Sequence, residues 1–364
     1  MKTITLTFAT LALKINHIER IIRRIISLIS FLLISHVIFG QNGGETVFQV
    51  LNLAPSARSL ALGGKYISAV DSDIVLSQFN PALASPASVK QVGISQSFYY
   101  SGSSNSGLGV GYYLDKQQIT ISGGLQYLQH GDILATDEFG NKTGTFRAGE
   151  LALIAGASKK IFDPLTIGIN FKYVTSNIEA YSSSGLGIDL GGLYTLSNGF
   201  KSIGFAVRNI GTQWSPYQDE KESLPLDVLI GFTQRLEHVP FILSVTSHSL
   251  NHWNLRYDNL QQEVSILGEP VTGPSGLSKS IDNLARHLIF SAEILLGKYA
   301  PLRLRLSYNH QRHQELKDQS YGGLSGFAGG FGIRISRLSF DYGMANYHLA
   351  GSIHSIGIGY RWKQ

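Results

Sequence analysis

The sequence LRLRLSYN at residues 302–309 and the sequence SIGIGYRW at residues 355–362 decide how this chain folds. In the first, leucine and tyrosine alternate with arginine, serine and asparagine. In the second, isoleucine and aromatic residues alternate with serine, glycine and arginine. A period of two is typical of β-strands with one apolar and one polar face. Because the apolar face of the last strand ends on Tyr360 and Trp362, the pattern favours a transmembrane barrel with lipid outside, a polar or glycine-lined lumen and an aromatic girdle.

The same alternation recurs along most of the chain. Most of the runs are close to the length of about 9–11 residues with which a tilted strand crosses a bilayer. The fourteen runs are 89–100, 105–114, 118–128, 145–158, 163–176, 184–196, 200–209, 225–236, 239–249, 285–297, 300–309, 324–335, 338–346 and 352–362. An even number agrees with bacterial barrels. The sequence therefore predicts an all-β protein, a transmembrane antiparallel barrel of 14 strands over residues 89–364.

The connections between these runs alternate in length. Short turns follow the even-numbered runs, whereas most odd-numbered runs are followed by longer loops. The longer loops are 129–144, 177–183, 210–224, 250–284 and 310–323, and the short exceptions are 101–104 and 347–351. Outer-membrane barrels have short periplasmic turns and longer external loops. A soluble β-sandwich has no reason to sort its loops in this way.

Residues 1–40 are predicted to be a secretory signal peptide. A region with three arginines precedes an apolar run from Ile25 to Phe39, which is the order of segments in such peptides and is short for a membrane-spanning helix. Cleavage is expected after Gly40, with residues 1–17 as an upstream extension. The alternative is a retained amino-terminal anchor. A signal peptide predicts export, and the barrel pattern predicts the outer membrane.

Residues 41–88 do not alternate and are rich in small side chains. A barrel of this size leaves a lumen that needs filling or gating. We therefore interpret this segment as an amino-terminal plug, or hatch, inside the barrel; the alternative is a periplasmic cap. The candidate plug residues are Arg58, Gly63, Gly64, Asn80 and Pro81.

The bulk composition agrees with a barrel. Charged residues make up 15% of the chain, against roughly 25% in soluble domains. The net charge of +5 is misleading, because five of the 30 basic residues and one of the 25 acidic residues lie in residues 1–40. The remaining chain is close to neutral, which argues against nucleic-acid binding. The absence of cysteine excludes disulfides and thiolate chemistry.

The motifs predict no catalytic, cofactor or metal site. His310 and His313 are three apart, and His248 and His252 four apart, but neither pair belongs to a closed set of zinc ligands. No serine motif stands at a strand-to-helix turn, and the glycine-rich pieces are not followed by a helix. The chain is therefore predicted not to be an enzyme.

Two of the longer loops carry apolar and aromatic residues. Exposed apolar segments mark interaction surfaces or lids. Loops 210–224 and 250–284 therefore predict either a docking surface outside the cell or a lid over the barrel mouth. The candidate docking residues are Trp214, Tyr217, Trp253 and Tyr257.

Several motifs resemble the PorQ family, outer-membrane barrels of the type IX secretion system of Bacteroidetes. They are residues 44–53 (GETVFQVLNL), 56–58 (SAR), 61–64 (ALGG), 80–83 (NPAL), 137–140 (DEFG), 144–146 (GTF), 209–213 (NIGTQ) and 224–225 (LP). The ALGG and NPA pieces also occur more widely among FadL-like barrels, including the related PorV proteins. The resemblance runs from about residue 44 to the carboxyl terminus. It implies fourteen strands and an amino-terminal hatch.

The resemblance also implies a function. Family members belong to a cell-surface attachment complex with PorU-, PorV- and PorZ-like proteins, which processes secreted cargo and joins it to lipopolysaccharide. The expected role is to anchor the PorZ-like partner, and no catalytic residues come with it. The alternative function is FadL-like transport of hydrophobic small molecules, for which residues 44–64 could line a pocket. One departure from a standard barrel-assembly signal is that Trp362 is followed by Lys363 and Gln364.

Overall fold

The structure is a computed structural model. It describes residues 46–69, 71, 73–196, 199–256, 276–298, 300–316, 323–349 and 351–362. All of these belong to one compact unit that begins at Thr46. The predicted signal peptide, residues 1–40, lies outside the described residues.

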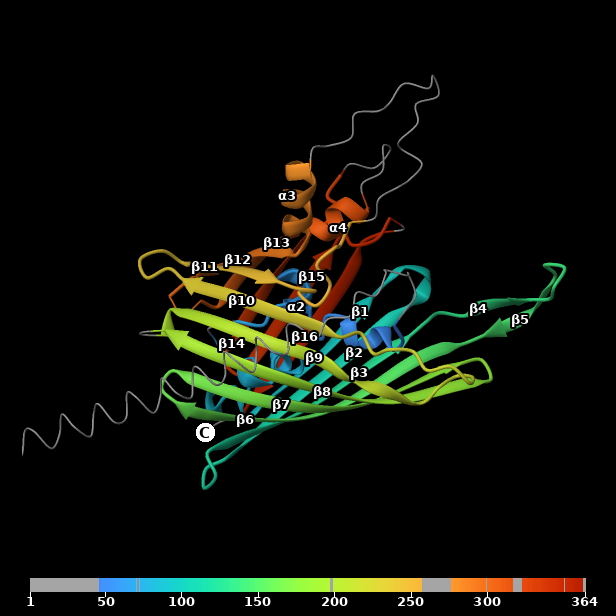
Figure 1. Ribbon diagram of the computed structural model, residues 1–364. Coiled ribbons are helices and arrows are strands. Elements are labelled where there is room, and N and C mark those ends of the chain that lie inside the picture. Colours follow the sequence, from blue (N-terminus) through green and yellow to red (C-terminus); the bar gives the residue numbers. More distant parts are fainter. Residues whose placement is uncertain are drawn as a thin grey trace, which may run out of the picture. The chain divides into compact units, whose positions relative to one another are not determined.

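Among the described residues, fourteen strands form a closed antiparallel barrel (Figure 1). The strands are β1 Gln91–Phe98, β2 Ser104–Leu114, β3 Ile119–Gln129, β6 Ala148–Phe162, β7 Leu165–Ile178, β8 Tyr181–Leu196, β9 Lys201–Ser215, β10 Asp227–Arg235, β11 Phe241–Ser247, β12 Leu288–Leu296, β13 Leu302–Asn309, β14 Phe327–Ile335, β15 Leu338–Ala345 and β16 Ile353–Arg361. Neighbours in the chain pair with one another, and β1 pairs with β16 to close the barrel, with Gln91 opposite Arg361. The prediction of a fourteen-stranded antiparallel barrel with an amino-terminal plug is confirmed.

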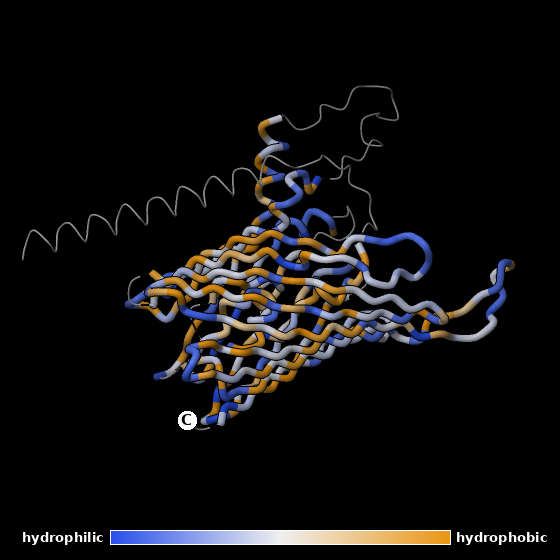
Figure 2. The backbone as a smooth tube through the Cα atoms, turned by 60° about the horizontal axis from the view of Figure 1, so that its bottom comes forward, coloured by the Kyte–Doolittle hydropathy of each residue, from blue (hydrophilic) through white to orange (hydrophobic). Residues whose placement is uncertain are grey.

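The two faces of each strand meet different surroundings, because successive side chains of a strand point to opposite faces. On β7, Ile167, Phe171 and Tyr173 are exposed on the outer surface, whereas Asn170 and Lys172 are buried in the lumen. Figure 2 shows the same alternation of hydrophobic and hydrophilic positions along the strands around the barrel. This arrangement, apolar outside and polar inside, is the one that lipid requires.

Within the described residues, no helix combines the length and the apolar character needed to cross a membrane.

The barrel has two unlike rims, which we call the inner rim and the outer rim. The inner rim carries the short turns, such as residues 115–118, 163–164 and 336–337. The outer rim carries the longer connections, including the β4–β5 hairpin (Ile133–Thr136 and Lys142–Phe146), helix α3 (Gly276–Arg286) and helix α4 (His310–Glu315). The expected loop 177–183 is instead a two-residue turn, because β7 and β8 continue pairing up to Ile178 and Tyr181.

The described residues between 46 and 89 lie inside the barrel and form the hatch, whereas residues 41–45 of the predicted plug lie outside the described residues. Its elements are the 3-10 turns η1 Gln49–Asn52, η2 Ile74–Gln78, η3 Pro81–Leu83 and η4 Pro86–Ser88, and the helix α2 Ala57–Ala61. Helix α2 contacts β1 and β13 to β16, while η3 contacts β6, β7 and β8 on another side of the wall. Most hatch side chains are buried, so the hatch supplies the hydrophobic core that the polar lumen wall does not.

Candidate functional site

Arg58 is positioned by a short, capped helix. The Ser56 side chain accepts a hydrogen bond from the Ser59 backbone N–H at 3.1 Å and so caps the start of α2. The helix ends at Ala61, and after Leu62 come Gly63 and Gly64, whose φ angles of 93° and 86° belong to the left-handed region that favours glycine. Both predicted plug glycines therefore terminate the helix that carries Arg58.

The Arg58 side chain is 5% exposed and faces three carboxylates. Its guanidinium donates to Asp71 at 2.8 Å, to Asp73 at 3.3 Å and to Glu293 of β12 at 3.3 Å. Asp71 and Asp73 belong to the hatch itself. Arg58 therefore holds two parts of the hatch together and joins both to the barrel wall.

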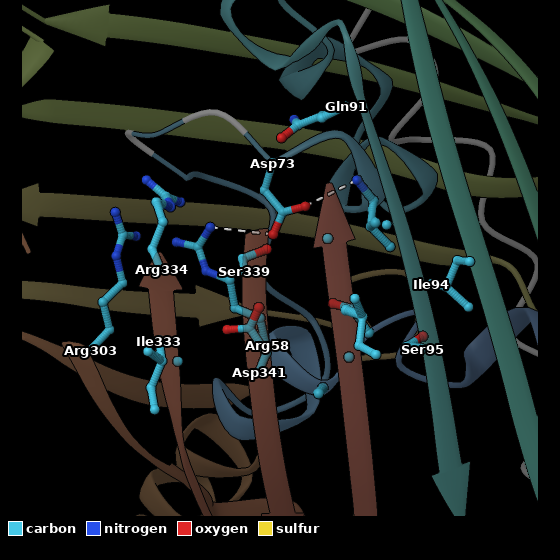
Figure 3. A pocket seen from close by; sticks show the side chains of 18 of the residues that line it. Arg58, Asp73, Gln91, Ile94, Ser95, Arg303, Ile333, Arg334, Ser339 and Asp341 are labelled. Carbon is cyan, nitrogen blue, oxygen red and sulfur yellow. Dashed lines mark hydrogen bonds and ion pairs between the residues drawn. The ribbon is translucent and has the colours of Figure 1, made fainter. Parts of the chain in front are cut away.

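Two arginines of β13 extend this set. Arg303 donates to Asp71 at 2.6 Å, and Arg305 bridges Glu293 at 2.7 Å and Asp341 of β15 at 2.5 Å. We call the seven residues the arginine–carboxylate cluster: Arg58, Asp71, Asp73, Glu293, Arg303, Arg305 and Asp341. Figure 3 shows four of them, Arg58, Asp73, Arg303 and Asp341, around one cavity. Buried charges are tolerated when each is paired, so the cluster fixes the inner half of the hatch.

The cavity at this cluster is small. It has a volume of about 70 Å³ and is lined by hatch residues and by β1, β13, β14, β15 and β16. Sites for drug-sized ligands are several hundred Å³ and mostly apolar. About half of the lining residues are polar or charged, four of them arginines, and the cavity is too small for a drug-sized ligand.

Asn80 and Pro81 lie where the hatch touches the opposite wall. The Asn80 side chain donates to the carbonyls of Ile67 at 2.8 Å and Gly192 at 3.2 Å, and it accepts from the Ala82 N–H at 3.0 Å. A side chain on Gly168 of β7 would place its Cβ 2.6 Å from the Pro81 carbonyl carbon. This glycine is therefore required for the hatch backbone to lie directly on the wall.

An apolar cluster lies in the outer half of the lumen. Val47, Phe48, Val50 and Leu51 of the hatch pack on side chains of three strands and one outer loop. The partners are Leu128 of β3, Ala152 of β6, Val174 of β7 and Leu224. On the other side, Ala54 and Leu60 pack on Ala328, Ala345 and Ile353. Segment 46–54 contains no charged residue, so apolar packing and hydrogen bonds hold it.

The lumen contains a second buried ion pair, which was not predicted from the sequence. Lys172 of β7 and Asp189 of β8 approach to 2.7 Å with almost no exposure. Asp189 also accepts from the backbone N–H of Asn209 at 2.8 Å, at an irregularity in the β8–β9 register. The available signal is a charged residue at a lumen-facing position of an alternating run, as at Lys172. The same signal marks Glu293, Arg303 and Arg305.

The candidate docking residues do not form one patch. Trp214, at the outer end of β9, is 71% exposed. Tyr217 instead packs against the hatch cluster around Val47 and donates its hydroxyl to Ser176. Trp253 is exposed and stacks on the His287 ring with 5.2 Å between centroids. Tyr257 lies outside the described residues.

The closing strand carries the two predicted aromatics at the inner rim. The rings of Tyr360 and Trp362 stack with 6.3 Å between centroids, and both remain partly exposed. The Trp362 N–H donates to the Lys90 carbonyl at 3.0 Å. Arg361 donates to the Gln91 side chain at 3.0 Å across the β1–β16 seam.

No group of three or more histidine, cysteine, aspartate or glutamate residues that could hold a metal ion occurs in the described part of the chain. His248 and His252 follow the end of β11, and His310 and His313 lie on α4. Their described contacts are with protein groups, such as His310 Nε2 with Asp282 at 3.1 Å.

Comparison with known structures places the fold. CymD, a monoaromatic hydrocarbon channel, superposes with a TM-score of 0.52 at 11% identity, over 87% of this chain and 100% of that one. This chain has the fold of outer-membrane barrel channels. The Pseudomonas putida toluene transporter TodX gives 0.49 at 12% identity (84% and 97% covered), and a Pseudomonas aeruginosa FadL homologue gives 0.48 at 10% identity (86% and 98%). No protein-family model and no curated protein matches the sequence. At these identities the likeness concerns the fold alone.

Proposed function

We propose that the barrel takes up hydrophobic small molecules across the outer membrane. The observation that carries the proposal is the apolar cluster between hatch segment 46–54 and the barrel wall, since the lumen of a general porin is polar and water-filled. Leu128, Ala152 and Val174 would line a chamber that the hatch segment 46–54 now occupies. The name of CymD as a monoaromatic hydrocarbon channel agrees with a cargo of this chemistry.

Uptake by this route requires segment 46–54 to leave the apolar chamber. Its hydrogen bonds include those from Val47 N–H to the Ser223 carbonyl at 3.1 Å and from Val50 N–H to the Glu150 carboxylate at 2.7 Å. The inner half of the hatch is held by the arginine–carboxylate cluster instead. A ligand that replaces the apolar contacts of segment 46–54 could therefore displace this segment while Arg58 keeps its partners.

A disulfide between hatch and outer loop tests this route. Thr46 and Ser223 form a β-bridge, and the chain has no cysteine of its own, so Thr46→Cys with Ser223→Cys places two thiols side by side. We expect the oxidised double variant to lose toluene uptake in cells and the reduced form to recover it. The single variants are the matched controls. Equal uptake by the oxidised and reduced double variant would contradict the proposal.

A second candidate function is anchoring of a surface partner, in line with the PorQ-family resemblance. Its support is the exposure of large aromatics on elements of the outer rim: Trp214 at the end of β9 and Phe139, 81% exposed, at the tip of the β4–β5 hairpin. Figure 1 shows this hairpin projecting from the barrel. The partners would be a PorZ-like surface protein with PorU- and PorV-like components, and the cargo would be joined to lipopolysaccharide.

Deleting the gene separates the two functions. Anchoring predicts that the PorZ-like protein and its cargo leave the cell surface, while toluene uptake is unchanged. Transport predicts that toluene uptake falls while the PorZ-like protein and its cargo stay on the cell surface. The variant Trp214→Ser with Phe139→Ser should reproduce the deletion phenotype of an anchor without altering the barrel, and retention of the partner by this variant would exclude the outer-rim aromatics as its docking site.

A further inference from the structure

Helix α3, at the outer rim, exposes an apolar stripe. Leu277, Ile281 and Leu284 are 73%, 59% and 50% exposed. Their spacing of four and three residues places them on one side of the helix. Three large apolar side chains on one exposed helix face require an apolar neighbour.

The opposite face of α3 is fixed to the protein. Asn283 is buried, accepts from the Leu255 N–H at 2.9 Å and donates to the Trp253 carbonyl at 2.5 Å. Asp282 pairs with Arg286 at 2.9 Å and with Arg256 at 3.0 Å. The helix is therefore held with its apolar stripe turned away from these contacts.

The neighbours of Asp282 stabilise the ionised form of its carboxyl group. Its partial burial acts to raise the pKa of this carboxyl, but hydrogen bonds from Arg286 and His310 and the charges of Arg286 and Arg256 hold the pKa below its ordinary value. A lowered pKa means that the pairs persist from neutral pH down through the usual range of a carboxyl and are lost only when the pH falls below it. The orientation of α3 is thus constant at physiological pH.

The helix that carries the stripe leads directly into the barrel wall. Helix α3 ends at Arg286, and β12 begins two residues later with Leu288, followed by the exposed Phe290 on its outer face. Figures 1 and 2 show α3 outside the strands, beside the outer ends of β12 and β13 and across the direction in which they run. A helix in this position lies at the edge of the apolar belt rather than over the lumen.

We propose that α3 is an interfacial helix that inserts Leu277, Ile281 and Leu284 at the boundary between headgroups and acyl chains of the outer leaflet. Amphipathic helices with a strongly polar opposite face lie in this plane of a membrane. The exposed Trp253, which stacks on His287 beside the end of α3, fits the same boundary, where tryptophan is enriched. The helix then fixes the depth of the barrel on the β12–β13 side.

Single cysteines carrying a fluorophore test the proposal in the full-length barrel reconstituted in phospholipid nanodiscs. We expect a label at Ile281→Cys to be quenched several-fold more strongly by spin-labelled lipid than by aqueous iodide. The matched control is Ser278→Cys, also exposed but about a quarter turn from the stripe, where iodide should quench more strongly. Folding of each variant is checked by the shift in gel mobility on heating.

The outcomes separate lipid from other neighbours. Equal quenching by iodide at both positions would show that the stripe faces water or awaits a protein partner, and would overturn the proposal. The triple variant Leu277→Ser, Ile281→Ser and Leu284→Ser, labelled at Trp253→Cys, provides a second test. It should lose lipid quenching at position 253 while the barrel stays folded; unchanged quenching would also contradict insertion by the stripe.

Discussion

Replacing Arg58 with methionine is expected to detach the inner half of the hatch and to lower the free energy of unfolding by about 3–5 kcal/mol, the range found when one partner of a buried ion pair is removed. Arg58 is almost fully buried, and its loss leaves Asp71 and Glu293 with fewer compensating charges. Urea unfolding in detergent measures the loss. Limited proteolysis of residues 46–89 should show the released hatch.

The matched control is Arg147→Met. Arg147 forms an exposed pair with Asp132 at 3.0 Å, with both side chains mostly in solvent, and such pairs contribute little. We expect no measurable change. Because Arg58→Met could prevent folding altogether, the double variant Arg58→Met with Asp71→Asn is informative: removing one carboxylate should recover part of the stability, in a cycle that measures their coupling. Strictly additive losses would show that Arg58 does not act through Asp71.

Replacing Ile358 with lysine is expected to destabilise the barrel by about 2–4 kcal/mol, the cost of a lysine on the lipid face near the bilayer midplane. Ile358 is 56% exposed near the middle of β16, between Ile94 of β1 and Phe340 of β15. Its neighbour outside the protein is therefore lipid. Reversible unfolding in liposomes, followed by tryptophan fluorescence, measures the difference.

A residue at a different depth in the membrane provides the control for Ile358→Lys. Ile335 is also exposed but ends β14 at the inner rim, where the cost of lysine falls to about 0–1 kcal/mol. A large loss for Ile358→Lys and a small one for Ile335→Lys would place the membrane along the strands. Equal, small losses would mean that the apolar belt faces water.

The strands could be predicted because every one of them separates two unlike surroundings. Lipid on the outer face favours apolar side chains, whereas the lumen favours small and polar ones. The sequence of each strand therefore alternates with a period of two. The ends of the strands were harder to predict from the sequence. Residues 177–183 read as a loop, but pairing between β7 and β8 continues to Ile178 and Tyr181, because a polar strand outside the membrane no longer needs the apolar alternation.

The hatch could be predicted in part. Small residues and the absence of alternation indicated a segment confined in the lumen, and Arg58 was among its candidate residues. The pairing of Arg58 with the barrel wall could not be predicted from the sequence, because its partner Glu293 lies 235 positions away. Tyr217 illustrates the same limit: in the sequence it stands beside Trp214 as a docking candidate, but in the structure it covers the hatch.

By itself, then, the sequence determined the barrel: the number of strands, their inward and outward faces and the two unlike rims follow from local alternation and spacing. Only the tertiary structure decided which charges meet in the lumen, which aromatics stay exposed at the outer rim, and that α3 turns Leu277, Ile281 and Leu284 outward beside β12. The physical reason is that alternation is a property of neighbouring residues, whereas pairing and exposure depend on elements brought together only when β1 meets β16 and the barrel closes around the hatch.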